Sequence, residues 1–319
     1  MTTAENNPST SPSSAPWPRI AVIGAGAVGG YFGGMLARAG APVIFIGRPA
    51  FVDSVNSNGL FLDTVQFQER IKAEASTELS AGRDCEIIFF CVKTTDTAET
   101  ARQLARLLPP NALIVSMQNG VDNAEQIHAA SGLTALAAAV YVAASVPVPG
   151  TVKHVGRGDL VLGPKNVSTE RVAEVFIRAG VPCKISDNLA GELWTKLVWN
   201  CALNAISALG KATYGDILAN ADAKQLVEEV VYEVLAVAKA AGISLPAFAD
   251  PQIAIATAYK IAGQMAATRS STAQDMMRNK KTEIDSLNGF IVRRAKELNI
   301  PVPINHGLFT LVKLAEGGS

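Results

Sequence analysis

Short apolar runs alternate with longer stretches of helical pattern through the first half of the chain. Each run is unbroken by polar residues, which is typical of strands that are buried on both faces of a sheet. Helical stretches follow at Tyr31–Ala39 and up to about Leu107. This alternation predicts an α/β fold, with an open parallel sheet that carries helices on both faces. The predicted strands are 19–23 (RIAVI), 43–46 (VIFI), 86–92 (EIIFFCV) and 113–116 (LIVS).

Residues 132–152 carry no charge over about twenty positions, which is the usual length of a membrane-spanning helix. However, Ala, Ser and Thr dominate this stretch, and it ends in Val-Pro-Val-Pro-Gly. The prolines and the glycine favour a strand that leads into a turn, so we expect no membrane span. The next segments, Thr151–Val155 and Asp159–Leu162, are separated by Gly-Arg-Gly and predict a β-hairpin.

The pattern becomes helical almost throughout after residue 187. Asp187 or Asn188 can cap a first helix that should run to about Leu209. We therefore expect a Rossmann-like dinucleotide-binding domain over residues 17–186 and an all-helical domain over 187–319. Residues 1–16 contain no apolar run, which predicts a disordered leader rather than a secretory signal. Further helices are predicted at 222–241, 251–265 and 273–298.

The composition narrows the classes of function. Of 319 residues, 49% are hydrophobic and 18% are charged, which excludes a disordered chain. The 28 basic and 28 acidic residues balance, and this argues against nucleic acid or an anionic membrane as a partner. The four cysteines form no CxxC pair and have no histidine cluster nearby, so we expect no metal and reduced thiols, as in the cytoplasm. Only three histidines are available for proton transfer.

A glycine pattern, G-x-G-x-x-G, follows the first predicted strand and opens the first predicted helix. In this context Gly24 permits a tight turn, Gly26 lets a pyrophosphate approach the backbone, and Gly29 lets the helix pack closely on the strand. The free N–H groups of the helix N-terminus would then face the phosphates. The predicted cofactor turn comprises Gly24, Ala25, Gly26, Ala27, Val28 and Gly29.

The end of the second strand indicates which dinucleotide is bound. An NAD enzyme usually places a carboxylate there for the ribose 2′-hydroxyl. This sequence has Ile46-Gly47-Arg48 instead, and a guanidinium suits a 2′-phosphate. We therefore predict NADP(H) as the cofactor, with Arg48 as the residue that recognises it. Lys93 and Asn119 follow two further strands at the edge where ligands bind in open α/β sheets, which places both beside the expected nicotinamide.

Polar residues recur every four positions along the predicted helix after 187. Glu192, Lys196, Asn200 and Asn204 form one slowly drifting stripe on an otherwise apolar helix. The stripe is either a solvent face with a Glu192–Lys196 pair or a surface that binds a ligand. A ketone that accepts a hydride also needs a proton, and burial would make a lysine a better acid near neutral pH. Lys196 is therefore the candidate proton donor.

Two later residues have ordinary interpretations when only their local sequence is considered. Ser271 lies in Ser-Ser-Thr-Ala-Gln-Asp at the start of a helix and could be its N-cap. Glu283 could be a solvated carboxylate.

Several segments together resemble the ketopantoate reductase family. They are GAGAVGG at 24–30, VK at 92–93, QNG at 118–120, ELWTKLVWNCALN at 192–204, SSTAQD at 270–275 and TEIDSLNG at 282–289. The resemblance implies an NADPH-dependent reduction of 2-dehydropantoate to (R)-pantoate, on the route to pantothenate and coenzyme A. It also implies a catalytic cleft between a Rossmann-like domain and a helical domain.

The resemblance also implies roles for individual residues. Lys196 matches the lysine that protonates the keto oxygen, and Glu283 the active-site glutamate. Asn119 matches the asparagine at the nicotinamide and the substrate, and Lys93 the lysine on the cofactor side. The implied substrate-binding residues are Lys196, Asn200, Asn204 and, for the carboxylate, Ser271.

Three positions depart from the family pattern: Thr268, Thr272 and Tyr214. Tyr214 stands where the family has a substrate-side asparagine, so the pocket could accept a different 2-keto acid. The alternatives are thus a paralogue that reduces another 2-keto acid and a non-catalytic NADP-binding protein. A homodimer is compatible with the resemblance, and the apolar helical half could supply its interface.

Overall fold

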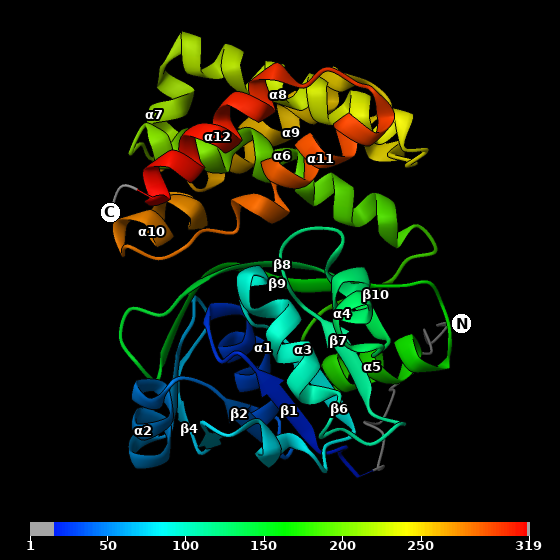
Figure 1. Cartoon of the computed structure of the whole chain (residues 1–319). Coiled ribbons are helices and arrows are strands. Elements are labelled where there is room, and N and C mark those ends of the chain that lie inside the picture. Colours follow the sequence, from blue (N-terminus) through cyan, green and yellow to red (C-terminus); the bar gives the residue numbers. More distant parts are fainter. Residues whose placement is uncertain (1–15, 318–319) are drawn as a thin grey trace, which may run out of the picture.

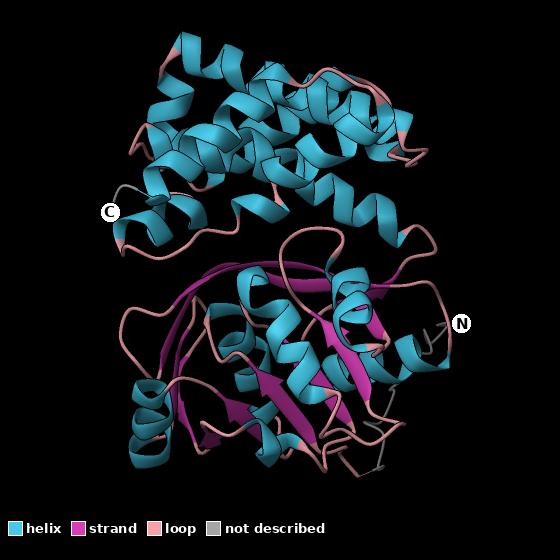
Figure 2. Ribbon diagram, in the orientation of Figure 1, coloured by secondary structure: helices cyan, strands magenta, loops and turns pink. Residues whose placement is uncertain are grey.

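The computed structural model describes residues 16–317, and it divides into a sheet-containing N-terminal part and a C-terminal part made of helices (Figures 1 and 2). Apart from Pro16, the leader expected over residues 1–16 lies outside the described residues. None of the described helices is long and apolar enough to cross a bilayer.

Five short strands form the parallel core of the N-terminal part. Their order is β5-β2-β1-β6-β7, and every neighbouring pair is parallel. This order confirms the expected open α/β sheet. Every residue of β1 and β6 is buried, which explains why these strands are unbroken apolar runs. The strands are β1 (Ile20–Ile23), β2 (Val43–Ile46), β5 (Glu74–Ser76), β6 (Ile87–Phe90) and β7 (Leu113–Ser116).

Helices cover both faces of this sheet (Figure 1). Alternate residues of β1 point to opposite faces: Ile20 packs with Phe32 of one helix, whereas Ala21 packs with Leu104 of another. The two faces of β1 therefore contribute to two separate apolar layers, one on each side of the sheet. The helices are α1 (Ala27–Arg38), α2 (Pro49–Asn58), α3 (Thr97–Leu104), α4 (Asn123–Ser131) and α5 (Val167–Arg178).

Two long strands extend the sheet along the side that faces the helical part (Figure 1). β8 (Ala135–Ser145) pairs in parallel with β7 and then in antiparallel register with β9 (Thr151–Leu162). The hairpin predicted within 151–162 is wrong, because β9 is one continuous strand and the chain reverses at 146–150 instead. Two short strands also pair with β9: β3 (Leu60–Asp63) and β10 (Cys183–Ile185). β3 pairs in turn with β4 (Gln68–Ile71), which ends the sheet.

Gly-Arg-Gly at 156–158 forms a bulge rather than a turn. The register of β8 and β9 shifts between Tyr141 and Val142, opposite this tripeptide. Arg157 and Gly158 have φ values of +56° and +127°. Left-handed backbone serves a tight turn and a bulge equally well, which is why the sequence pattern did not distinguish them.

The C-terminal part is all-helical, as predicted, and has its own apolar core. The Asn188 side chain caps the first helix by accepting a hydrogen bond from the Gly191 amide at 3.1 Å. The expected boundary at 186/187 lies between β10 and this helix and stays a prediction. The helices are α6 (Leu189–Leu209), α7 (Tyr214–Ala219), α8 (Ala221–Ala240), α9 (Pro251–Gln264), α10 (Ser271–Met277), α11 (Asn288–Leu298) and α12 (Pro303–Gly317).

The single helix predicted over 273–298 is wrong. α10 ends at Met277, a 3₁₀ turn follows at Ile284–Ser286, and α11 begins at Asn288. Asn279 has a φ of +49°, which ends the helical path, and the Thr282 hydroxyl accepts a hydrogen bond from the Ile284 amide. The break therefore places Glu283 in a loop rather than on a helix.

Candidate active site

The glycine turn between β1 and α1 has the geometry of a phosphate-binding turn. Gly24 has a φ of +94°, and a Cβ there would lie 2.6 Å from the Val92 nitrogen. A Cβ at Gly29 would lie 2.6 Å from the Gly24 carbonyl oxygen, so this position is also closed to side chains. Gly26, by contrast, faces open space. It is the N-cap of α1 and offers no side-chain cap, so a bound phosphate can approach the first amides of the helix.

Arg48 lies where β2 ends and α2 begins. Its backbone carbonyl accepts hydrogen bonds from the amides of Phe51 and Val52, which fixes the start of α2. The side chain is exposed and makes no hydrogen bond or ion pair with another residue in the part of the chain that the structure describes. A free guanidinium beside the glycine turn is suited to a phosphate ester.

Lys196 projects from α6 onto the N-terminal part. Its Nζ donates to Asn119 Oδ1 at 2.9 Å and to the Val140 carbonyl at 2.5 Å. Burial lowers the pKa of Lys196 to about 8, and this effect outweighs the Glu283 charge, which raises the pKa. An ammonium has three donors, so one remains for a further acceptor. This lysine can therefore act as an acid near neutral pH.

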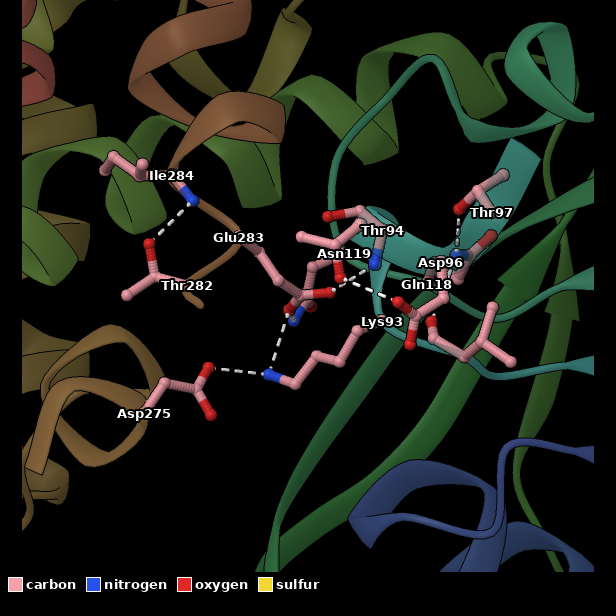
Figure 3. A network of polar contacts seen from close by, with 12 residues as sticks. Lys93, Thr94, Asp96, Thr97, Gln118, Asn119, Asp275, Thr282, Glu283 and Ile284 are labelled. Carbon is pink, nitrogen blue, oxygen red and sulfur yellow. Dashed lines mark hydrogen bonds and ion pairs between the residues drawn. The ribbon is translucent and has the colours of Figure 1, made fainter. Parts of the chain in front are cut away.

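Glu283 is the centre of a network that joins the two parts of the chain (Figure 3). Its Oε1 accepts from the Thr94 amide at 3.1 Å and its Oε2 from Asn119 Nδ2 at 3.0 Å. The same Oε2 lies 3.6 Å from Lys93 Nζ, which also binds Asp275 at 2.7 Å. Asn119 thus bridges Glu283 and Lys196, and its amide is oriented by both.

Burial and the neighbouring charges shift the pKa values of Lys93 and Asp275 in this network. Burial alone would lower the pKa of Lys93, but the carboxylates of Glu283 and Asp275 outweigh it and raise that pKa. Burial raises the pKa of Asp275 despite the neighbouring Lys93. Lys93 therefore stays cationic, whereas Lys196, which has no carboxylate in direct contact, does not hold its proton as strongly.

The backbone beneath Asn119 is fixed by side-chain hydrogen bonds between strand ends. Gln118 Nε2 donates to the Val92 carbonyl at 3.0 Å and to Thr97 Oγ1 at 2.7 Å. The Asn119 carbonyl accepts from Asn123 Nδ2 at 2.6 Å. Since both strand ends are tied together, Asn119 is held where it can meet Lys196.

The structure brings together four of the predicted residues, Lys93, Asn119, Lys196 and Glu283, but not all of them. Asn204 is 4% exposed, and its Oδ1 accepts from the Tyr214 hydroxyl at 3.4 Å. Ser271 is exposed on the first turn of α10, and the N-cap of this helix is its neighbour Ser270. Asn200 is partly buried and makes no hydrogen bond to another residue within 16–317.

Sequence reasoning missed three groups of this site: the Asp275 carboxylate, the Thr94 amide and the Val140 carbonyl. Asp275 lies one helical turn after Ser271 in a motif already singled out, which could have indicated a shared face. The two backbone groups had no sequence signal. Within the described residues, no group of three or more His, Cys, Asp or Glu side chains could hold a metal ion.

The glycine turn at the start of α1, together with the buried lysine across the junction, is the arrangement expected of an NAD(P)H-dependent oxidoreductase, and the family comparison shows this class. The family model described as Ketopantoate reductase PanE/ApbA matches residues 20–166, and the model of its C-terminal domain matches residues 188–316. The chain belongs to the ketopantoate reductase PanE/ApbA family.

Relatives cover nearly the whole chain. The 2-dehydropantoate 2-reductase of Pyrococcus abyssi is 32% identical over 92% of this chain and 97% of its own length. The solved PanE/ApbA family ketopantoate reductase from Ralstonia eutropha JMP134 is 45% identical, with a TM-score of 0.88 over 94% of this chain and 99% of that one. A D-mandelate dehydrogenase solved with NADH and anilino(oxo)acetate shares the fold, at 23% identity and a TM-score of 0.86 over 94% of this chain and 98% of that one.

Proposed function

We propose that this protein is a 2-dehydropantoate 2-reductase, which reduces its substrate to (R)-pantoate with NADPH for pantothenate and coenzyme A synthesis. The observation that carries the proposal is the contact of Lys196 with Asn119, which in turn binds Glu283. The curated relatives named 2-dehydropantoate 2-reductase, such as that of Pyrococcus abyssi, support it.

The proposed mechanism assigns one task to each residue. NADPH supplies a hydride to the keto carbon when it is bound. The amides of the glycine turn hold the pyrophosphate, Arg48 the 2′-phosphate, and Lys93 the nicotinamide side. Lys196 donates its proton to the keto oxygen, and the resulting amine recovers a proton from water. Asn119 and Glu283 orient the ammonium through the Asn119 amide, and Asn200 and Ser271 contact the substrate.

A second candidate is the reduction of another 2-keto acid. Tyr214, which replaces an asparagine of the family pattern, is bonded to Asn204, so this amide is committed to a contact within the helical part. A pocket with no asparagine at position 214, and with the Asn204 amide already bonded, would bind a substrate hydroxyl less well. The D-mandelate dehydrogenase with this fold is consistent with a wider range of 2-keto acids. Assembly as a homodimer and location in the cytoplasm stay predictions.

Turnover of a substrate panel tests the proposal. NADPH oxidation should be fastest with 2-dehydropantoate, compared with 2-ketoisovalerate, pyruvate and phenylglyoxylate. Lys196→Ala should lower kcat by roughly 10²–10⁴-fold, the usual contribution of a general acid, with little change in NADPH affinity. Lys260→Ala, which removes an exposed lysine from α9, is the matched control. Preference for another 2-keto acid would select the second candidate, and absence of any turnover would leave an NADP-binding protein.

Cofactor preference tests the role of Arg48. Arg48→Gln removes the charge that would pair with the 2′-phosphate, and a lost charged hydrogen bond corresponds to roughly a ten- to hundredfold weaker NADPH affinity. NADH lacks this phosphate, so its affinity should stay the same. Titration of both cofactors by intrinsic fluorescence measures the two values. An equal loss for NADH and NADPH would show that Arg48 has another role.

A further inference from the structure

Arg157, a cation that the proposed mechanism does not use, lies on β9 at the side that faces α6. Its guanidinium carbon is 4.0 Å from the centre of the Tyr141 ring. The Tyr141 hydroxyl in turn donates to the Glu192 carbonyl on α6 at 3.2 Å, and its ring lies 6.1 Å from that of Trp199. Arg157 is therefore placed at the junction of the two parts of the chain, beside the helix that carries Lys196.

The backbone that carries Arg157 is built to aim its side chain. Arg157 adopts a left-handed conformation within the bulge, which is uncommon for a residue other than glycine. The buried ring of His154 donates through Nε2 to the Arg157 carbonyl at 2.5 Å. The same ring stacks on Tyr31 of α1, with 4.3 Å between the ring centres. The bulge is thus fixed to the cofactor helix, and bulges commonly redirect a side chain beside an active site.

One edge of the guanidinium is occupied and the other is open. Nε and Nη2 donate to the two carboxylate oxygens of Asp159 at 3.0 and 2.7 Å. Nη1 makes no hydrogen bond to any residue between 16 and 317, and the side chain is 54% exposed. Asp159 and Tyr141 therefore orient the fork, and a second anion could bind its free edge.

Arg157 and Lys196 approach the same stretch of β8. Lys196 Nζ binds the carbonyl of Val140, and Arg157 stands opposite Val142 in the strand register. Burial is the main cause of the lowered pKa of Lys196, and the charge of Arg157 lowers this pKa further. A 2-keto acid carries its carboxylate on the carbon next to the ketone, so a substrate whose ketone lies at Lys196 presents an anionic group beside the same stretch of β8.

We propose that the free edge of Arg157 binds the carboxylate of the 2-keto acid and so selects 2-keto acids over neutral ketones. The proposal rests on the proposed function and deepens it. Ser271, the residue that the family resemblance assigns to the carboxylate, carries no charge and is exposed on α10. A guanidinium provides the charge that a hydroxyl does not.

Two substitutions separate charge from backbone effects. Arg157→Gln and Arg157→Lys both keep a side chain that is unbranched at Cβ, so the left-handed backbone costs both variants about the same as the wild type. Arg157→Gln should raise the KM for the 2-keto acid roughly ten- to hundredfold, whereas Arg157→Lys should keep part of the affinity. NADPH affinity should stay unchanged. In Arg157→Gln, the fall of kcat at alkaline pH should move to higher pH, because Lys196 loses a neighbouring like charge.

The control is Arg171→Gln, which breaks a half-exposed ion pair with Glu86 remote from the site. The second readout is calorimetric binding of oxamate, a 2-keto acid mimic, to the protein with NADP⁺, since this binding requires no turnover. Loss of oxamate binding in Arg157→Gln supports the proposal even if the wild type reduces no 2-keto acid, in which case only the proposed function fails. An unchanged KM and unchanged oxamate affinity would overturn the role of Arg157 and leave the proposed function intact. The role of Arg157 would also be overturned if Arg157→Gln weakened only NADPH binding, or if the wild type bound no oxamate.

Discussion

At the scale of single residues, the chemistry depends on how each polar side chain is partnered. Lys93 and Lys196 are both lysines at the junction of the two parts, yet their pKa values move in opposite directions. Lys93 touches Asp275 directly, whereas the direct partners of Lys196 are a neutral amide and a carbonyl. Burial therefore dominates at Lys196 and makes it the better proton donor.

This difference predicts the pH dependence of the reduction. Lys196 can donate a proton only while it is protonated, which holds below its pKa of about 8. The kcat for ketone reduction should therefore fall as the pH rises through that value. Glu283→Gln removes a charge that raises the pKa of Lys196, so the fall should begin at lower pH in this variant. Steady-state kcat across the pH range measures both, and a flat profile far above pH 8 would exclude Lys196 as the acid.

The polar stripe of α6 shows how far residue spacing can predict a site. Lys196 meets Asn119, as expected, but Asn204 meets Tyr214 instead. An α-helix advances about 100° per residue, so each step of four residues drifts by about 40° and two steps by about 80°. The stripe therefore predicted a functional face near Lys196, but this face does not extend unchanged to Asn204.

At the scale of elements, the predictable parts are those with a strong and local pattern. The strands β1, β2, β6 and β7 were predicted because burial on both faces leaves continuous apolar runs. Edge strands such as β4, with three of its four residues exposed, carry no such signal.

Two breaks in regular structure were missed, and both serve the candidate site. The bulge at Arg157 was predicted as a turn, because positive φ suits either feature. The break between α10 and α11 was predicted as continuous helix, because residues 278–287 contain neither proline nor glycine. The break nevertheless frees Glu283 to reach the Thr94 amide. Irregular backbone is thus where local pattern fails and where the side chains of the site are placed.

At the scale of the whole molecule, the two parts have separate apolar cores. They meet at a junction that has an apolar side and a polar side. Tyr141 and Val161 pack with Leu189 on one side, in a small apolar cluster between the strands and α6. Lys93, Asp275 and Glu283 form polar contacts elsewhere, between residues more than 180 positions apart in the chain. The periodicity of the sequence indicates no such distant partners, and only the family resemblance placed Lys93 and Glu283 at one site. Since polar contacts between domains are easily exchanged with water, we expect motion on this side and a fixed apolar side.

Asp275→Asn tests this division. The substitution removes the carboxylate that binds Lys93 across the junction, and the partly exposed pair should contribute on the order of 1 kcal/mol to closure. The radius of gyration of the ligand-free protein, measured by small-angle scattering, should therefore increase, while circular dichroism keeps the same helix content. Glu69→Gln is the matched control, because it breaks the 2.6 Å pair with Arg38 inside the N-terminal part. If neither variant changes the scattering curve, the apolar cluster around Tyr141 alone sets the arrangement of the two parts.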